Sequence, residues 1–201
     1  MSYKEIEIDW LEELIAPAID QFYATPRDHD LLNRDVSERA IVGVIFCNAR
    51  TKLKELQTVN PELADLEIDL EYNRNLLTSK EVFNKCNDCS DAKCYVKKKN
   101  ILDTTRQSYS YPDMIIHQRG SNVNNQVVIE FKKANNRRGR KEDKAKLTFL
   151  TCQKPFPNNE ERNYQFRIGF FIDFCVNECT IATYLDATCQ DLRFRKEGRW
   201  I

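Results

Sequence analysis

The chain has 201 residues, of which 41% are hydrophobic and 31% charged, and its formal net charge is zero. These values describe a soluble chain with room for one core, so we expect a single domain over residues 1–201. A neutral total excludes a whole-molecule field that attracts polyanions, so any nucleic-acid surface must be a local patch. No apolar run approaches about 18 residues and no signal peptide is apparent, so we expect no membrane segment and a cytoplasmic, intracellular location.

Two helices are predicted in the N-terminal part of the chain. Apolar residues recur with a helical period over residues 4–23, where Pro17 is expected to kink the helix or divide it in two. Residues 25–35 are polar and are expected to form a turn. Ser37 is a suitable N-cap for the second helix, over residues 37–57, whose apolar stripe predicts one face on the core.

Strands are predicted where apolar residues alternate or form short runs. Residues 66–73 alternate apolar and acidic side chains and are expected to form a half-buried strand. Residues 114–117 and 127–131 flank a turn containing Gly and Asn, so we expect them to pair as antiparallel neighbours. Between these parts, residues 74–110 are polar and cysteine-bearing and are interpreted as an irregular insertion, with room for a short helix near 79–85.

The C-terminal part is predicted to add a helix and further strands. Helical spacing over residues 143–150 is followed by a continuous apolar and aromatic run at 164–174, which is typical of a buried strand, and then by a strand at 180–186. This order of elements predicts an α/β fold with a mixed central sheet flanked by helices. It leaves the order of the strands open.

One group of charged residues suggests chemistry. Glu130 and Lys132 share a face of their predicted strand, and antiparallel pairing can bring Asp113 alongside them. Two adjacent carboxylates repel unless a cation lies between them, and a lysine can orient a water or stabilise an oxyanion. Oxygen ligands favour Mg²⁺ or Mn²⁺, with the main-chain carbonyl of Ile129 or Phe131 as a further ligand. A phosphodiester is the natural target of such a site.

These residues resemble a known family. Pro112-Asp113, followed by Glu130-Phe131-Lys132 after an apolar run, is similar to the motif of the PD-(D/E)XK nuclease superfamily, which has a restriction-endonuclease-like fold. The resemblance spans about residues 36–175 and implies an αβββαβ core with Mg²⁺-dependent hydrolysis of DNA. It implies that Asp113 and Glu130 bind the metal and that Lys132 positions or activates the attacking water. It also implies that Glu38 binds a second ion or a metal-bound water.

Two alternatives to this assignment stay open. Glu130 and Lys132 are alternatively the solvated face of an amphipathic strand, with Asp113 as a turn residue. The insertion makes the segment before Asp113 unusually long for the family, so Asp69 or Glu71, at the end of the first strand, would compete with Asp113 for the metal.

A basic run directly follows the motif strand. It forms a local cationic surface on a neutral molecule and is predicted to hold a phosphate backbone over the metals. Alternatively it is a mobile, solvated loop, as charge runs often are. Ordered contacts are expected above all from Lys144 and Lys146. The predicted nucleic-acid contacts are Lys133, Arg137, Arg138, Arg140, Lys144 and Lys146.

The insertion contains three closely spaced cysteines. Cys86, Cys89 and Cys94 have a spacing that can reach one structural zinc ion, but no fourth ligand lies nearby in the sequence. The alternative is that they are reduced thiols without a metal. Candidates for a distant fourth ligand are Cys47, His117, Cys152, Cys175 and Cys179.

The sequence therefore predicts a metal-dependent nuclease that hydrolyses phosphodiester bonds in DNA. The alternative is a non-catalytic module of the same fold that binds nucleic acid or another protein within a larger assembly. A third hypothesis is a zinc-organised interaction protein. DNA is the expected partner, and a homodimer or a larger defence or repair assembly is considered beside it. Concerted cutting of both strands by one-site subunits would need a dimer.

Overall fold

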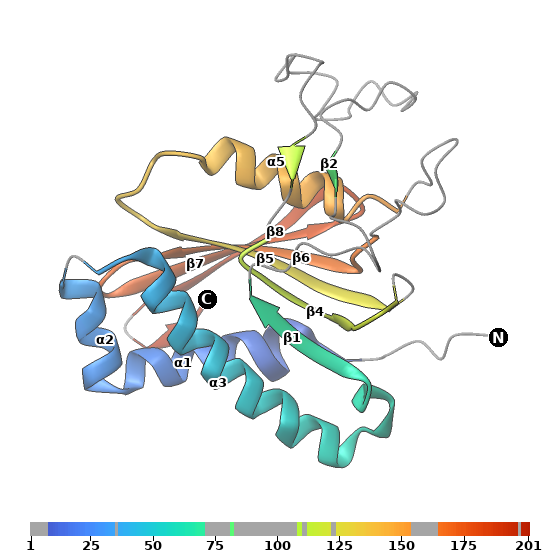
Figure 1. Cartoon of the computed structure of the whole chain (residues 1–201). Helices are drawn as coiled ribbons and strands as arrows, with labels where there is room; N and C mark the ends of the chain where they lie inside the picture. Colours follow the sequence, from blue (N-terminus) through green and yellow to red (C-terminus); the bar gives the residue numbers. More distant parts are fainter. Residues whose placement is uncertain are drawn as a thin grey trace.

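The structure is a computed structural model in which a seven-stranded sheet separates helices on its two faces (Figure 1). It describes residues 8–34, 36–70, 81–82, 108–109, 112–121, 124–153, 165–196 and 198–201. Within these ranges, no helix is long and apolar enough to cross a membrane.

The N-terminal apolar segment forms two helical pieces. A π-helical turn, Leu11–Ile15, is followed by helix α1, Ala16–Ala24. Pro17 lies directly after the change from π- to α-helical hydrogen bonding, and Ile15 and Ala16 before it keep right-handed helical backbone angles. We predicted that Pro17 would kink this helix or divide it in two. The helical type changes directly before Pro17, but the helix continues through the change without a break.

Residues 25–35 do not form the predicted turn. They contain helix α2, Pro26–Asn33, which buries none of its residues. A helix without a buried face has no apolar stripe, so its pattern resembles that of a polar loop. The next helix, α3, spans Glu38–Val59 as predicted, with Ser37 at the N-cap position, although the Ser37 side chain makes no capping hydrogen bond.

All neighbouring strands of the sheet are antiparallel except β5 and β6, which are parallel. Helix α5, Arg140–Leu150, lies between β5 and β6 in the chain and provides the long connection that parallel neighbours require. The predicted antiparallel pairing of the two motif strands, β4 and β5, is confirmed. In their order across the sheet, the strands are β1 Leu66–Leu70, β4 Met114–Gln118, β5 Asn125–Lys133, β6 Ile168–Phe174, β7 Glu178–Leu185, β8 Thr188–Lys196 and β9 Arg199–Trp200.

Alternate residues of β5 belong to different parts of the core. Val127, Ile129 and Phe131 pack with α1 and α3, whereas Val128 packs with the apolar residues of α5. In Figure 1, α1, α2 and α3 accordingly lie on one face of the sheet and α5 on the other. The prediction of an α/β fold with a mixed sheet flanked by helices is confirmed.

Helix α3, strands β1, β4 and β5, helix α5 and strand β6 follow one another in the predicted order, apart from the insertion. Within the insertion, β2, Glu81–Val82, pairs with β3, Ser108–Tyr109. The prediction of a short helix near residues 79–85 is wrong at residues 81–82, which form strand β2. Strands β8 and β9 were not predicted.

Candidate functional site

The candidate site lies where β5 extends beyond β4. Pairing with β4 ends at Ile129, whereas β5 continues to Lys133 beside β6. Backbone N–H groups of this extension need partners other than β4. The Phe131 N–H donates to Asp113 Oδ2 at 2.7 Å, and the Lys133 N–H donates to Glu38 Oε2 at 2.8 Å. Two predicted metal ligands from separate elements thus meet at the open end of one strand.

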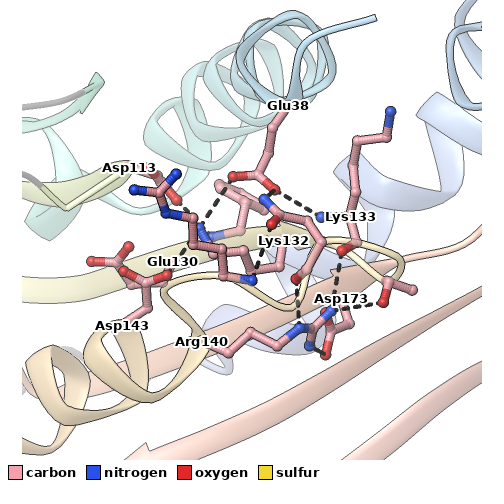
Figure 2. A network of polar contacts seen from close by, with 12 residues as sticks. Glu38, Asp113, Glu130, Lys132, Lys133, Arg140, Asp143 and Asp173 are labelled. Carbon is pink, nitrogen blue, oxygen red and sulfur yellow. Dashed lines mark hydrogen bonds and ion pairs between the residues drawn. The ribbon is translucent and has the colours of Figure 1, made fainter. Parts of the chain in front are cut away.

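The charged residues of the motif face α5, as Figure 2 shows. Only 1% of Glu130 is exposed, and its Oε1 lies 2.7 Å from the Nζ of Lys146 on α5. Lys132 Nζ lies 2.9 Å from Oδ2 of Asp143 on the same helix. The prediction that Glu130 and Lys132 share a face is confirmed, but the solvated-face alternative is wrong because Glu130 is buried.

Asp143 is the main residue of the site that the sequence analysis did not identify. Its two oxygens bind two lysines, Lys132 at 2.9 Å and Lys146 at 3.0 Å. Lys132 also donates to Oε1 of Glu38 at 3.3 Å, so it connects α3 to α5 across the end of β5. A signal was present, because Asp143 and Lys146 are one turn apart on the predicted helix.

Glu130 and Asp143 are buried, and Asp113 and Glu38 are half-buried beside them. Burial raises the pKa of Asp113, against the effect of the hydrogen bond from Phe131. Burial also raises the pKa of Glu130 well above its ordinary value; Lys146 opposes this rise, whereas Asp113 and Asp143 add to it. Both groups are therefore carboxylates whose charged form requires a nearby cation.

The two lysines stay protonated. Burial alone would lower the pKa of Lys132, but the hydrogen bond and charge of Asp143, together with Glu38, outweigh burial and raise that pKa. Glu130 and Asp143 likewise raise the pKa of Lys146, although burial opposes this rise. Both side chains are thus ammonium ions at neutral pH.

The charges of the site fit a divalent cation. When all groups are ionised, the four carboxylates (Glu38, Asp113, Glu130 and Asp143) exceed the two ammonium groups by two negative charges. Carboxylate oxygens are the ligands that Mg²⁺ and Mn²⁺ prefer. The residues therefore fit such an ion by donor type and by charge. Among the described residues, however, no three His, Cys, Asp or Glu side chains form a ready-made metal cluster.

The basic run divides into an inner and an outer group. Two inner side chains, Arg140 and Lys146, make ion pairs with acidic residues, and Lys133 Nζ donates to the Val36 carbonyl at 3.1 Å. Lys144 is exposed, with its Nζ 4.8 Å from the centroid of the Phe171 ring. The exposed outer group consists of Arg137, Arg138, Lys141 and Lys144.

Arg140 ties the loop after β5 to the sheet. Its guanidinium donates to Oδ2 of Asp173 on β6 at 2.6 Å and to the carbonyl oxygens of Asn136 and Lys133 at 2.7 and 3.1 Å. An isolated aspartate in the apolar run of β6 was the sequence signal for this partner. The loop thereby gains several fixed contacts to the edge of the candidate site.

Asp69, the alternative metal ligand, is engaged elsewhere. Its Oδ2 lies 2.9 Å from Nε2 of the buried His117, and Arg119 donates to both of its oxygens. Burial would raise the pKa of Asp69, but the hydrogen bonds and charges of Arg119 and His117 hold it well below its ordinary value. Glu71 lies outside the described residues.

The predicted zinc ligands Cys86, Cys89 and Cys94 also lie outside the described residues. Two of the candidates for a distant fourth ligand have other surroundings: His117 bonds to Asp69, and Cys179 is buried in the core among α1 and α3.

Comparisons of the chain with models of protein families, with curated proteins and with solved structures found no match. The functional argument therefore depends on the site itself.

Proposed function

We propose that the protein is a metal-dependent nuclease, similar to the PD-(D/E)XK superfamily, that hydrolyses phosphodiester bonds in DNA inside the cell. One observation carries the proposal: Asp113, Glu130 and Lys132 meet on one face at the open end of β5, with Glu38 beside them. The order of α3, β1, β4, β5, α5 and β6 matches the restriction-endonuclease-like core and supports the same assignment.

Asp113 and Glu130 would hold Mg²⁺ or Mn²⁺, and Glu38, which accepts a hydrogen bond from Lys132, would bind a second ion or its water. When bound, the ion supplies stabilisation of the charge that develops on the phosphate and lowers the pKa of a water. Binding would also relieve the surplus of negative charge around the two buried carboxylates.

Lys132 is better suited to positioning than to proton abstraction. Asp143 and Glu38 hold its ammonium group from two sides, and its raised pKa keeps it protonated. A fixed ammonium group can orient the attacking water and donate to a phosphate oxygen. Asp143 is the positioning residue that fixes Lys132 and Lys146 relative to Glu130.

The outer cations of the loop and α5 would contact the DNA backbone. Arg137, Arg138, Lys141 and Lys144 are exposed next to the site, and contacts of this kind to phosphates make binding sensitive to salt.

A specific observation favours the non-catalytic alternative. Each of the four carboxylates of the site already has a partner within the chain: the Phe131 N–H for Asp113, the Lys133 N–H for Glu38, Lys146 for Glu130 and Lys132 for Asp143. A purely structural network that closes the end of β5 would look the same. Activity is therefore the property that separates the two functions.

The test is cleavage of supercoiled plasmid and of single-stranded DNA by the purified protein with Mg²⁺, Mn²⁺ or EDTA. We expect cutting only with metal, reduced by about 100-fold or more in Glu130→Gln and in Lys132→Met. Lys54→Met, an exposed substitution on α3 sixteen residues after Glu38, is the control and should cut normally. Mg²⁺ should also raise the melting temperature of the wild type but not of Glu130→Gln. A wild type that neither cuts nor responds to metal would establish the non-catalytic alternative.

A further inference from the structure

A row of four side chains crosses the α5 face of the sheet, starting at the candidate site. Lys132 on β5 pairs in register with Asp173 on β6, Asp173 with Thr180 on β7, and Thr180 with Phe194 on β8. Residues paired in register lie on the same face of a sheet. Neighbouring strands are about 4.8 Å apart, so Phe194 lies roughly 14 Å, or three strand spacings, from Lys132.

The row ends at an exposed aromatic side chain. Phe194 is 45% exposed and Leu192, on the same face, is 49% exposed. The arginines that alternate with them along β8 lie on the opposite face, where Arg193 bonds to Glu12 and Arg195 to Asp20. The ring of Phe194 is therefore directed away from α1 and is available at the surface.

A cavity lies along the row between the site and Phe194. It has a volume of about 330 Å³, and its lining includes Arg137, Asp173, Glu178 and Thr180. Arg137 is exposed, whereas the charge of Asp173 is neutralised by Arg140. Glu178, a second acidic residue that lines the cavity, lies in register opposite Lys196. The surface of the row thus offers the exposed guanidinium of Arg137 followed by an aromatic ring.

We propose that this row binds a single strand of DNA next to the cleavage site, with a phosphate on Arg137 and an unpaired base stacked on Phe194. The inference rests on the proposed nuclease function and narrows its substrate to DNA with a single-stranded segment. A basic groove combined with an exposed aromatic side chain is the usual means of binding single strands, because every base has a face that can stack. Inside a duplex the stacked neighbours cover both faces of each base, so a single-stranded segment is needed for a base to stack on Phe194.

A second copy of the chain fits this surface less well. Two half-exposed side chains provide far less than the roughly 800 Å² per partner of a stable interface. The remaining surface of the row is polar and includes cationic groups, which suits a phosphate backbone.

The test is binding of fluorescein-labelled oligo(dT) and of a matched duplex, measured by anisotropy in EDTA so that no cleavage occurs. We expect the wild type to prefer the single strand and Phe194→Ala to weaken oligo(dT) binding roughly 5- to 150-fold, the range measured for loss of one stacked base. Phe194→Trp should retain binding. Leu192→Ala, which removes an equally exposed side chain without a ring, should change the affinity less than twofold.

The outcomes separate this inference from the proposed function. Tight oligo(dT) binding that depends on Phe194 supports the row even if the protein cuts no DNA. If Phe194→Ala cuts DNA with metal as the wild type does and binds oligo(dT) with the wild-type affinity, the proposal that the row binds a single strand is refuted. The proposed nuclease function would be unaffected by that result. Equal losses in Leu192→Ala and Phe194→Ala, or a dimer in size-exclusion chromatography that Phe194→Ala dissociates, would also overturn it.

Discussion

Replacing Lys146 with methionine should destabilise the protein strongly, because it leaves a buried carboxylate without its cation. Lys146 lies 2.7 Å from Glu130, which is 1% exposed, and 3.0 Å from Asp143. Methionine keeps most of the length and apolar volume of lysine, so the substitution removes the charge with little loss of packing.

The magnitude follows from which groups lose a partner. Breaking a buried ion pair by removing one member costs about 3–5 kcal/mol. Only Glu130 is left unpaired, because Asp143 keeps Lys132 at 2.9 Å, so we expect the low end, about 3 kcal/mol. For a chain of this size, that corresponds to a decrease in melting temperature of roughly 6–12 °C.

Urea denaturation at neutral pH without divalent metal measures the free energy of unfolding, and Lys141→Met is the matched control on the exposed side of α5. The control should stay within about 0.5 kcal/mol of the wild type. Adding Glu130→Gln to Lys146→Met should recover more than half of the loss, because the uncompensated charge is removed. A loss below about 1 kcal/mol, or no recovery in the double variant, would refute the ion pair as the partner of Glu130.

Two further predictions concern the sheet. Gly169→Ala on β6 should cost about 1–3 kcal/mol in a urea titration, because an added Cβ would lie 2.9 Å from Thr151 Cγ2 and 3.3 Å from Leu147 Cδ2. Gly43→Ala in α3, where no atom of the described residues would lie within 4 Å of the added Cβ, should instead stabilise by up to about 1 kcal/mol. A neutral Gly169→Ala would contradict the close helix–sheet packing. The lowered pKa of Asp69 means that this side chain binds a proton more readily in the unfolded chain than in the folded one. The stability that Asp69 contributes is therefore complete above its ordinary pKa of 3.8 and is lost as the pH falls below that value. Asp69→Asn should therefore be less stable than the wild type at pH 7, and its stability should fall less between about pH 4 and pH 2 when both are followed by thermal unfolding; parallel pH curves would show that Arg119 and His117 do not hold that charge.

Elements with a strong local pattern could be predicted from the sequence. A few neighbouring residues are enough to show that one face of an element, or both faces, will be buried. Such local patterns are the apolar stripe of α3, the alternation in β1 and the apolar run of β6. Helix α2 has no buried face and most residues of β8 are exposed, so neither has such a pattern. Their formation depends on the elements beside them.

The same distinction applies to the candidate site. The two-residue period of a strand was enough to place Glu130 and Lys132 on one face, and pairing of neighbouring strands brought Asp113 beside them. The contact of Glu38 with the Lys133 N–H joins residues 95 positions apart, and the binding of both lysines by Asp143 requires α5 to lie over the end of β5. The charged groups, and the side of a strand on which each lies, could be predicted from the order of residues alone. Which charges meet depends on the folded arrangement, because strand order and helix position follow from burying apolar faces that are distant in the chain.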